Sequence, residues 1–243
     1  MEIWGDFHTH TVHSHGTGSV CDNVRTAESK GLELIAITDH GPASMGHLGI
    51  KNIAELKQLK EEIEECKSEF PGMLVLRGIE ANIINLEGDL DIPVAEQKEL
   101  DIVLAGFHTL IRPQSVREGL AFISRAMRAR FSVRDRLSAR NENTKTIIEA
   151  IHRNKIDIVT HPGLHIDIDS KELARACVGT DTLLEINSSH EMSLDFVRIT
   201  AGEGVNFVVN SDAHTPEQVG DVQRGLALIK NAGLDPARVI NLK

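Results

Sequence analysis

The sequence has no tyrosine, one tryptophan and seven phenylalanines, so only 3% of its 243 residues are aromatic. We have no physical account of the missing tyrosine. No stretch approaches the roughly 18 uninterrupted apolar residues of a membrane-spanning helix. The chain also opens on a short apolar run, not on a basic segment followed by a longer apolar one. Neither a membrane span nor a secretory signal peptide is therefore expected.

Cysteine is scarce as well. The three cysteines, Cys21, Cys66 and Cys177, lie far apart and form no Cys-x-x-Cys pair. An odd number of cysteines without a regular spacing argues against a disulfide framework and fits the reducing cytoplasm. The expected location is therefore cytoplasmic.

Positive charge is concentrated in one segment of an acidic chain. The formal net charge is −10, which disfavours long nucleic acids as partners, because such binding depends on neutralising phosphates. Residues 112–140 nevertheless hold eight arginines against Glu118 and Asp135, a net +6 that leaves −16 for the rest of the chain.

This arginine-rich excursion, at about 111–142, interrupts the regular pattern, and long excursions are often functional. Three interpretations remain open. The segment is solvated and packs its apolar positions locally, or it is a lid that carries arginine to a phosphate-bearing substrate, or it is a contact in a homo-oligomer. Its apolar positions are Leu120, Ile123, Met127 and Phe131.

Short apolar, β-branched runs alternate with helical segments along the chain. The runs predicted to form strands are Ile3–Phe7, Leu34–Thr38, Leu74–Ile79, Ile102–Gly106, Ile156–Thr160, Thr182–Asn187 and Asn206–Asn210. The predicted helices are Asn23–Lys30, Ile53–Glu69, Thr144–Asn154, Lys171–Val178, Ser193–Glu203 and Val222–Ala232. The stretch Ile83–Ile92, around Gly88, is predicted to form a small hairpin.

Strands separated by helices indicate parallel pairing with right-handed crossovers. Seven such units favour an α/β fold whose sheet closes, or nearly closes, into a barrel; a doubly wound open sheet is the alternative. The chain has no internal repeat or flexible linker, so we expect a single domain over residues 1–243.

Nearly every predicted strand is followed by a histidine or a carboxylate. Because the carboxyl ends of parallel strands meet on one rim, these side chains are expected to converge. His8 and His10 stand two residues apart, which places both on one side of a strand, and Asp212 and His214 repeat this spacing. Glu80 can bridge two cations through its two oxygens. The other candidate metal ligands are His15, His40, His108 and His161.

Two neighbours of these candidates leave choices open. His13 competes with His15 for the first loop, where Gly16 slightly favours His15 because it lets the backbone fold tightly around an ion. Asp39 can orient His40 by accepting its second ring proton, or it can cap a helix. Nine ligands exceed the roughly four that one ion uses, so two or three divalent ions are expected. Zinc, iron, cobalt, nickel or manganese suit these donors.

The order of these motifs resembles that of one family. From Asp6 to about Asn241 the chain presents in turn His-x-His, Thr-Asp-His-Gly-Pro, Arg-Gly-Ile-Glu-Ala-Asn, Ala-Gly-Phe-His, His-Pro-Gly, Glu-Ile-Asn and Ser-Asp-x-His. This order resembles the PHP (polymerase and histidinol phosphatase) superfamily, and within it the YcdX-like phosphatases, which carry three zinc ions. The resemblance implies a distorted (βα)7 barrel and metal-dependent hydrolysis of phosphoric esters.

The resemblance also implies how three ions, most often zinc, would share the nine candidate ligands. The implied sets are His8, His10, Glu80 and Asp212 for the first ion, Glu80, His108 and His161 for the second, and His15, His40 and His214 for the third.

Such a site would use a metal-activated hydroxide against a phosphoric ester while the ions neutralise the phosphoryl oxygens. The expected activity is that of a phosphomonoesterase acting on a small phosphorylated metabolite. Histidinol phosphate is an alternative substrate, and a nuclease or phosphodiesterase acting on short oligonucleotides is an alternative enzyme. A metal-stabilised regulatory module is the non-enzyme alternative. Asp39 and His190 are the candidates for an auxiliary acid or base.

Overall fold

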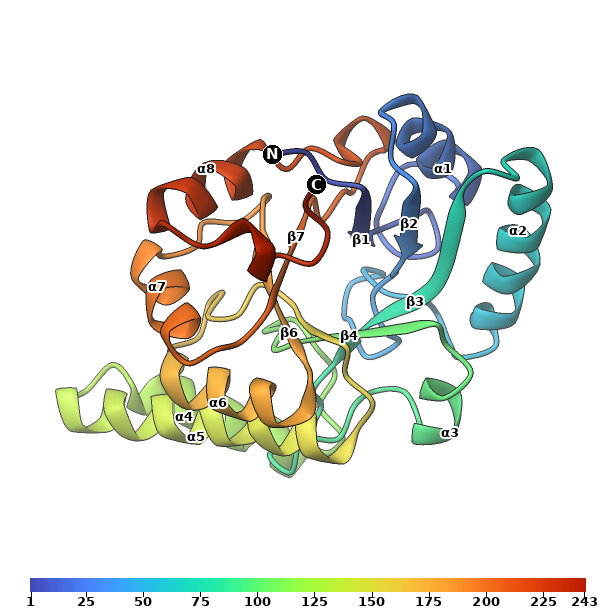
Figure 1. The fold of residues 1–243 in the computed structure, drawn as a ribbon. Coiled ribbons are helices and arrows are strands. Elements are labelled where there is room, and N and C mark those ends of the chain that lie inside the picture. Colours follow the sequence, from blue (N-terminus) through green and yellow to red (C-terminus); the bar gives the residue numbers. More distant parts are fainter.

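The structure, a computed structural model, describes all residues from 1 to 243. Seven parallel strands lie in the sheet in chain order, and helices surround them (Figure 1). The strands are β1 (Gly5–Thr9), β2 (Leu34–Ile37), β3 (Leu74–Asn82), β4 (Ile102–Gly106), β5 (Ile158–Val159), β6 (Leu183–Asn187) and β7 (Phe207–Asn210). The expected α/β barrel is therefore confirmed.

Eight α-helices and two short 3₁₀ turns connect the strands. The α-helices are α1 (Val20–Ser29), α2 (Glu55–Glu69), α3 (Val94–Gln97), α4 (Val116–Arg128), α5 (Val133–Arg153), α6 (Ser170–Thr180), α7 (Leu194–Gly202) and α8 (Gln223–Ala232). The 3₁₀ turns are η1 (Pro216–Gln218) and η2 (Pro236–Arg238). None of these helices has both the length and the hydrophobicity needed to cross a membrane.

Several helices begin where the sequence supplies a side-chain cap. Ser19, Ser115 and Ser132 accept hydrogen bonds from backbone N–H groups in the first turns of α1, α4 and α5. Asp169 does the same for α6. These caps satisfy donors that have no partner within the helix, and they fix where each helix starts.

Three predicted elements differ from those observed. The strand expected over Ile156–Thr160 shrinks to β5, and the helix expected over Thr144–Asn154 is only the second half of α5. The hairpin expected over Ile83–Ile92 is reduced to one antiparallel bridge between Ile83 and Leu90. Its turn needs Gly88, which has φ of 83° and leaves no room for a Cβ against the backbone of α5.

The sheet is nearly closed, because a seam between β1 and β7 is bridged without a full strand ladder. Near the rim, Thr9 pairs with Ala213 in an isolated parallel bridge. Lower down, the Asn241 side chain donates to the carbonyl oxygens of Gly5 and Val209 and accepts from the Val209 N–H. The open doubly wound sheet is therefore wrong.

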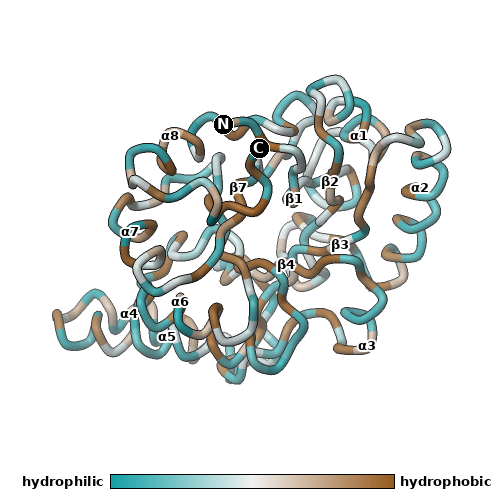
Figure 2. The backbone as a smooth tube through the Cα atoms, viewed as in Figure 1, coloured by the Kyte–Doolittle hydropathy of each residue, from teal (hydrophilic) through white to brown (hydrophobic).

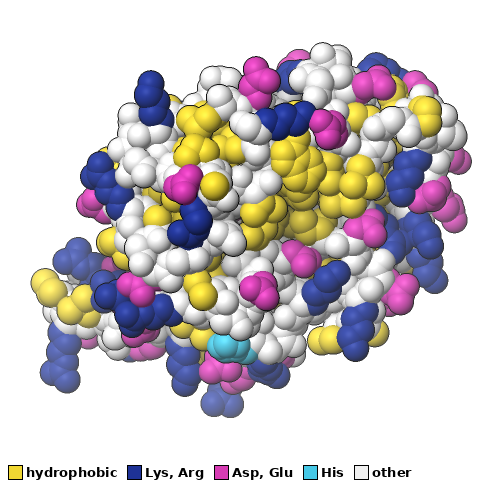
Figure 3. All heavy atoms as spheres, in the orientation of Figure 1, with side chains coloured by type: hydrophobic (Ala, Val, Ile, Leu, Met, Phe, Trp, Pro, Cys, Tyr) yellow, Lys and Arg dark blue, Asp and Glu magenta, His cyan; other side chains and the backbone are white.

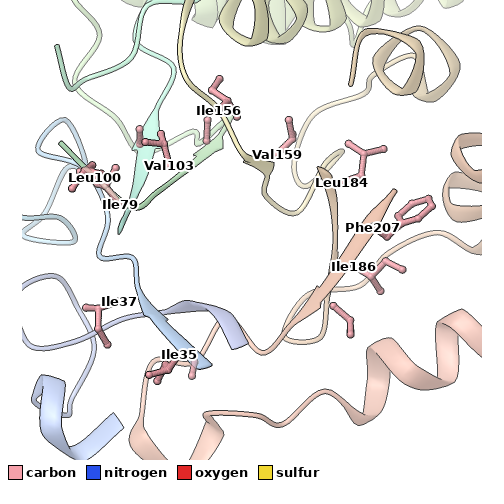
Figure 4. Packing of buried hydrophobic residues seen from close by; sticks show 14 of the residues in the cluster. Ile35, Ile37, Ile79, Leu100, Val103, Ile156, Val159, Leu184, Ile186 and Phe207 are labelled. Atoms are coloured by element: carbon pink, nitrogen blue, oxygen red, sulfur yellow. The ribbon is translucent and has the colours of Figure 1, made fainter. Parts of the chain in front are cut away.

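The apolar core has two parts. A large cluster fills the layer between strands and helices, and Figure 4 shows its members Ile35, Val103 and Phe207 pointing away from the barrel axis. Along the chain, apolar residues follow the strands while the exposed side of α2 is hydrophilic (Figure 2). A smaller cluster is separate from it. Its buried members are Phe7, Leu34, Ala36, Ile102, Leu104, Ile158 and Val208.

The arginine-rich segment forms a projecting arm, which we define as residues 111–142. It comprises α4 and the first half of α5, which extend beyond the barrel (Figure 1). The expectation that its apolar positions pack locally is wrong. Leu120, Ile123, Met127 and Phe131 have exposed fractions of 62, 59, 54 and 78%.

Candidate metal centre

His8 and His10 lie side by side at the end of β1, as their two-residue spacing predicts. The pairing of β1 with β2 shifts register between Asp6 and Thr9, and an irregularity of this kind re-aims the side chains that follow it. The Nε2 atoms of the two histidines are 3.1 Å apart. They lie 3.4 Å and 3.1 Å, respectively, from Oδ1 of Asp212. The three side chains are arranged as ligands of one cation.

Glu80 stands between two groups of imidazoles. Its Oε2 lies 3.4 Å from His8 Nε2 and 2.6 Å from His40 Nδ1. Its Oε1 lies 3.2 Å from His108 Nε2 and 2.8 Å from His161 Nε2. Each carboxylate oxygen therefore faces a different set of nitrogens, which is the arrangement of a carboxylate that bridges two cations.

Three atoms of this cluster are buried without a hydrogen-bond partner. They are Oε2 of Glu80, Nδ1 of His40 and Nδ1 of His10. The first two lie 2.6 Å apart, but their angles are not those of a hydrogen bond. Unpaired buried polar atoms destabilise a fold by about 1–3 kcal/mol each. A cation placed between a carboxylate oxygen and an imidazole nitrogen would satisfy both, so the donor set fits bound metal.

A third group of histidines lies beside the first. The His15 ring stacks on His40 at a centroid distance of 4.9 Å and lies 4.1 Å from the His214 ring. His13 instead points to α2, where its Nε2 lies 2.9 Å from Glu62 Oε2. The structure thus brings His15 to the cluster and His13 away from it.

Glu185, on β6, is a functional residue to which our sequence interpretation gave no role. It is fully buried, and its Oε1 lies 2.7 Å from His8 Nδ1. Its two oxygens also accept from the side chains of Asn187 and Asn210 and from the His161 N–H. A carboxylate behind a ligand histidine fixes the ring and raises its basicity. The sequence signal that could have identified Glu185 was a single acidic residue among the apolar residues of a predicted strand.

Asn82 plays the corresponding part behind His108. Its Oδ1 lies 2.8 Å from His108 Nδ1, and its amide nitrogen donates to Asp91 at 2.7 Å. A carboxylate accepts only, so the contact with Asp91 fixes which end of the amide faces the histidine. His108 in its neutral form therefore carries its proton on Nδ1, and Nε2 is left to bind a cation.

The charges of the cluster favour cation binding. Burial opposes ionisation of Glu80, but His40 and His8 hold the pKa of this carboxyl well below its usual range. His8 and His10 do the same for the pKa of Asp212 against a similar effect of burial. Burial and the neighbouring His40 hold the pKa of His10 well below its usual range. Burial acts to lower the pKa of His8, but Glu185, Asp212 and Glu80 raise it well above its usual range. A metal requires ionised carboxylates and neutral imidazoles, so its binding would displace a proton from His8.

The two candidate auxiliary residues occupy different places. Asp39 is buried and accepts from the Thr11 N–H and hydroxyl, each at 2.7 Å, and from the Ser14 hydroxyl. It makes no hydrogen bond to His40, so the expectation that it orients this ring is wrong. His190 lies at the rim with Nε2 3.3 Å from Asp212 Oδ2, and its side chain is 40% exposed.

Two candidate ligands sit on backbone that non-glycine residues rarely adopt. The φ angles are 28° for His161 and 55° for Asp212. Both residues lie two positions beyond the carboxyl ends of β5 and β7, and the His161 N–H donates to Glu185 at 2.7 Å. Such conformations are maintained by surrounding contacts and concentrate at functional sites.

A cavity of about 240 Å³ opens above the cluster. One part of its wall is apolar, formed by Leu48, Phe107, Leu110 and Leu164. No lysine or arginine lines it, so the arm does not act as an arginine lid in this structure. The polar lining residues are His15, His40, Ser44, His108, Thr109, His161, His165, His190, Asp212 and His214.

Comparison with known proteins shows which family the chain belongs to. The family model of the PHP domain matches residues 6–196. The chain belongs to the PHP family. Two PHP relatives carry the name probable phosphatase. One, from Thermoanaerobacter sp. (strain X514), is 35% identical over 99% of this chain and 91% of its own length. The other, from Shewanella sediminis, is 33% identical over 99% and 90%.

A solved PHP-type structure has the same fold. The histidinol phosphate phosphatase of Lactococcus lactis, determined with zinc, L-histidinol and phosphate, gives a TM-score of 0.61. It is 16% identical and covers 97% of this chain and 95% of its own. This likeness confirms the fold, whereas the family match and the relatives named probable phosphatase confirm the expected family and a hydrolase of phosphoric esters.

Proposed function

We propose that this PHP protein is a phosphomonoesterase that hydrolyses a small phosphorylated metabolite at a site of three divalent ions, with zinc the preferred metal. The observation that carries the proposal is the position of Glu80, whose two oxygens face two separate sets of imidazoles. A third set lies within stacking distance of the first. One ion could not use all of these donors.

The proposed ligands are those brought together by the contacts above. The sets are His8, His10, Glu80 and Asp212, then Glu80, His108 and His161, then His15, His40 and His214. His40 also approaches Oε2 of Glu80, the oxygen beside His8, to 2.6 Å, so it stands where the first and third sets meet. Since a single sheet carries all nine, we further propose that residues 1–243 work as one domain, in the cytoplasm, where its three free cysteines would stay reduced.

Bound divalent ions supply two things to ester hydrolysis, a water of lowered pKa and positive charge on the phosphoryl oxygens. The chain's own residues supply the rest. No lysine or arginine lines the cavity, so only histidines and bound cations can neutralise the phosphate there. His190, half-exposed at the mouth beside Asp212, is placed to donate a proton to a departing alcohol oxygen. Asp39 is a weaker candidate, since Thr11 and Ser14 occupy its oxygens.

The size and the lining of the cavity favour a small substrate. Its volume of about 240 Å³ suits a phosphate with a short organic group, and its apolar wall favours contact with that group rather than with a second phosphate. Histidinol phosphate is the second candidate, because the Lactococcus protein of the same fold holds L-histidinol and phosphate. A nuclease or diesterase is disfavoured by the cavity's size and by the acidity of the chain outside the arm.

The test compares two chromogenic esters with metal-replete protein. A monoesterase should hydrolyse p-nitrophenyl phosphate and leave bis(p-nitrophenyl) phosphate largely intact. Elemental analysis of the same sample should find three ions per chain, and a panel of phosphorylated metabolites that includes histidinol phosphate should identify the substrate class.

Other outcomes would assign a different function. Preference for the bis ester or for short single strands would indicate the diesterase. Metal-loaded protein that is inert towards every ester, yet loses thermal stability with a chelator, would indicate the regulatory module and overturn the proposal.

A further inference from the structure

We propose that the outer face of α4 is an interface that docks against a second copy of this chain. This proposal concerns assembly and is independent of the phosphatase activity. It begins with a stripe of large apolar side chains on α4. Val116, Leu120, Ile123 and Met127 are spaced by four, three and four residues, which places them on one face of the helix. Their exposed fractions run from 54 to 80%.

The inner face of α4 is already occupied, and it is partly polar. The Phe122 ring packs edge-to-face on Phe107, with centroids 5.5 Å apart. Arg125 is buried and donates to Asn143 and Thr146 on α5. The helix thus turns its polar contacts inward and its continuous apolar stripe outward, the reverse of an ordinary surface helix.

The apolar surface continues beyond α4. Phe131, in the connection, is 78% exposed, and Val133 and Leu137, on α5, are 64 and 45% exposed. Figure 3 shows hydrophobic and basic side chains together at the projecting end of the molecule. Exposed apolar patches of this extent mark contact sites, and a three–four spacing is the pattern of helices that pack against other helices.

Charge indicates which surface covers the stripe. Five arginines of the arm take part in no ion pair of the structure, whereas Arg125, Arg128 and Arg140 do. The five are Arg112, Arg117, Arg130, Arg134 and Arg136. The arm carries eight arginines against Glu118, Asp135 and Glu142, a net +5, and the remainder of the chain carries −15. The body of a second copy is therefore the electrostatic complement of the arm.

Anionic membranes and nucleic acids are the other surfaces that such an arm would suit. Either would have to approach an arm attached to a body of charge −15, which repels phosphate-rich surfaces. A second copy meets no such penalty, because arm and body attract when each copy offers its arm to the other. Contacts of this reciprocal type close into symmetric assemblies.

The experiment measures the mass of the assembly by light scattering during size exclusion. Wild-type protein should run as an oligomer, and the double variant L120E/I123E should fall to the single-chain mass of 26.7 kDa. Both side chains are solvent-exposed, so the variant should fold, which circular dichroism checks. The matched control V178E/I199E adds the same charges at apolar positions of α6 and α7 that are 45 and 46% exposed, and it should keep the oligomer.

A charge-reversal variant tests the electrostatic half of the proposal. R130E/R134E should also shift the protein towards single chains, and high salt should do so in the wild type. A wild type that runs as a single chain, or an L120E/I123E variant that keeps its mass, would overturn the proposal. So would a single-chain wild type that binds phosphatidylserine vesicles or a single-stranded oligonucleotide through the arm, since that would assign the face to a membrane or nucleic acid.

Discussion

The histidine cluster and the arm depart from ordinary protein surfaces in opposite directions. In the cluster, polar atoms of Glu80, His10 and His40 are buried without partners. On the arm, large apolar side chains such as Val116 and Phe131 stand in solvent. In the isolated chain the polar atoms of the cluster lack partners and the apolar side chains of the arm lack cover, and in each region a bound partner would remove the deficiency. The difference between them indicates the component, a cation for the first and another protein surface for the second.

The two regions also differ in how they are held. The cluster is fixed from several sides, because its members come from the ends of β1, β2, β3, β4, β5 and β7 and are backed by Glu185 and Asn82. The arm is tied to the body through a few contacts, among them Phe122 on Phe107 and Arg125 with α5. Substitutions in the cluster should therefore change chemistry, whereas those in the arm should change stability and assembly.

The largest effect should come from Glu80→Gln. The substitution removes the charge that joins the two imidazole groups while keeping the shape of the side chain. We expect kcat/KM for p-nitrophenyl phosphate to fall by more than about 100-fold, since changing only the partners of metal ligands already reduces activity by about 10–100-fold. Elemental analysis should show fewer ions per chain.

The control for this variant is Glu62→Gln, which removes the partner of His13 outside the cluster. Its activity and metal content should match the wild type. Full activity in Glu80→Gln would remove the bridging carboxylate from our account of the site.

The next effect should come from Glu185→Gln, which leaves every proposed ligand in place. The variant loses the negative charge behind His8. Both oxygens of Glu185 accept hydrogen bonds in the wild type, so the NH₂ group of the glutamine must face a donor such as the His161 N–H or its neighbours. We expect metal affinity to fall by about 10–100-fold, measured by competition with a chromogenic chelator. Gln at the surface residue Glu203 should change nothing, and an unchanged affinity in Glu185→Gln would show that this carboxylate only supports the fold.

A smaller effect is expected in the arm from Arg125→Met. The change removes the donor that Asn143 and Thr146 accept from, and it removes one of the two arginines that pair with Glu142. Unsatisfied groups of this kind lower the free energy of unfolding by about 1–3 kcal/mol, which urea denaturation measures. Arg128→Met removes the exposed partner of the same glutamate and should cost less than about 1 kcal/mol. Equal losses would mean that burial of Arg125 is unimportant.

The smallest effect should be a pH dependence of the arm through Glu142. Burial acts to raise the pKa of this carboxyl, but Arg128, Ser138 and Arg125 hold it below its ordinary value of 4.5. Because the folded pKa is the lower one, the stabilisation is fully present above pH 4.5 and is lost as the pH falls through the folded pKa. The side chain is partly exposed and screened, so we expect less than about 1 kcal/mol.

The measurement compares urea midpoints of wild type and Glu142→Gln. The two should differ at neutral pH and converge at pH values below 4.5. A difference that persists in acid would assign the contribution of Glu142 to packing.

Much of the fold and of the candidate site could be predicted from the sequence, because the apolar strands and the side chains suited to metal both form clear patterns. Buried parallel strands are continuous apolar runs, and nearly every run contained or was followed by a side chain suited to metal, as with Glu80 in β3 and His108 just after β4. The four-residue α3 was not predicted, because Val94–Gln97 is too brief to show a period. The strand predicted over Ile156–Thr160 was found, but β5 is shorter, Ile158–Val159.

The rest depended on contacts that no local pattern contains. Nothing near Glu185 in sequence indicates that it meets His8, 177 residues away. The sequence suggested that Asp39 accepts a hydrogen bond from the adjacent His40, but in the structure its carboxylate accepts from the Thr11 hydroxyl. The apolar positions of the arm had a helical period, which predicts an amphipathic helix but does not say whether the chain itself covers that face.

The seam between β1 and β7 joins segments that lie far apart in the sequence. The Asn241 amide donates to the Gly5 carbonyl oxygen across 236 positions, so the barrel cannot close before the segment that carries Asn241 has been synthesised. His8 and Asp212 flank the same seam, and an ion held between them would hold these two distant segments together. Metal supply would then influence how often newly made molecules reach the finished barrel, as well as how fast they turn over an ester.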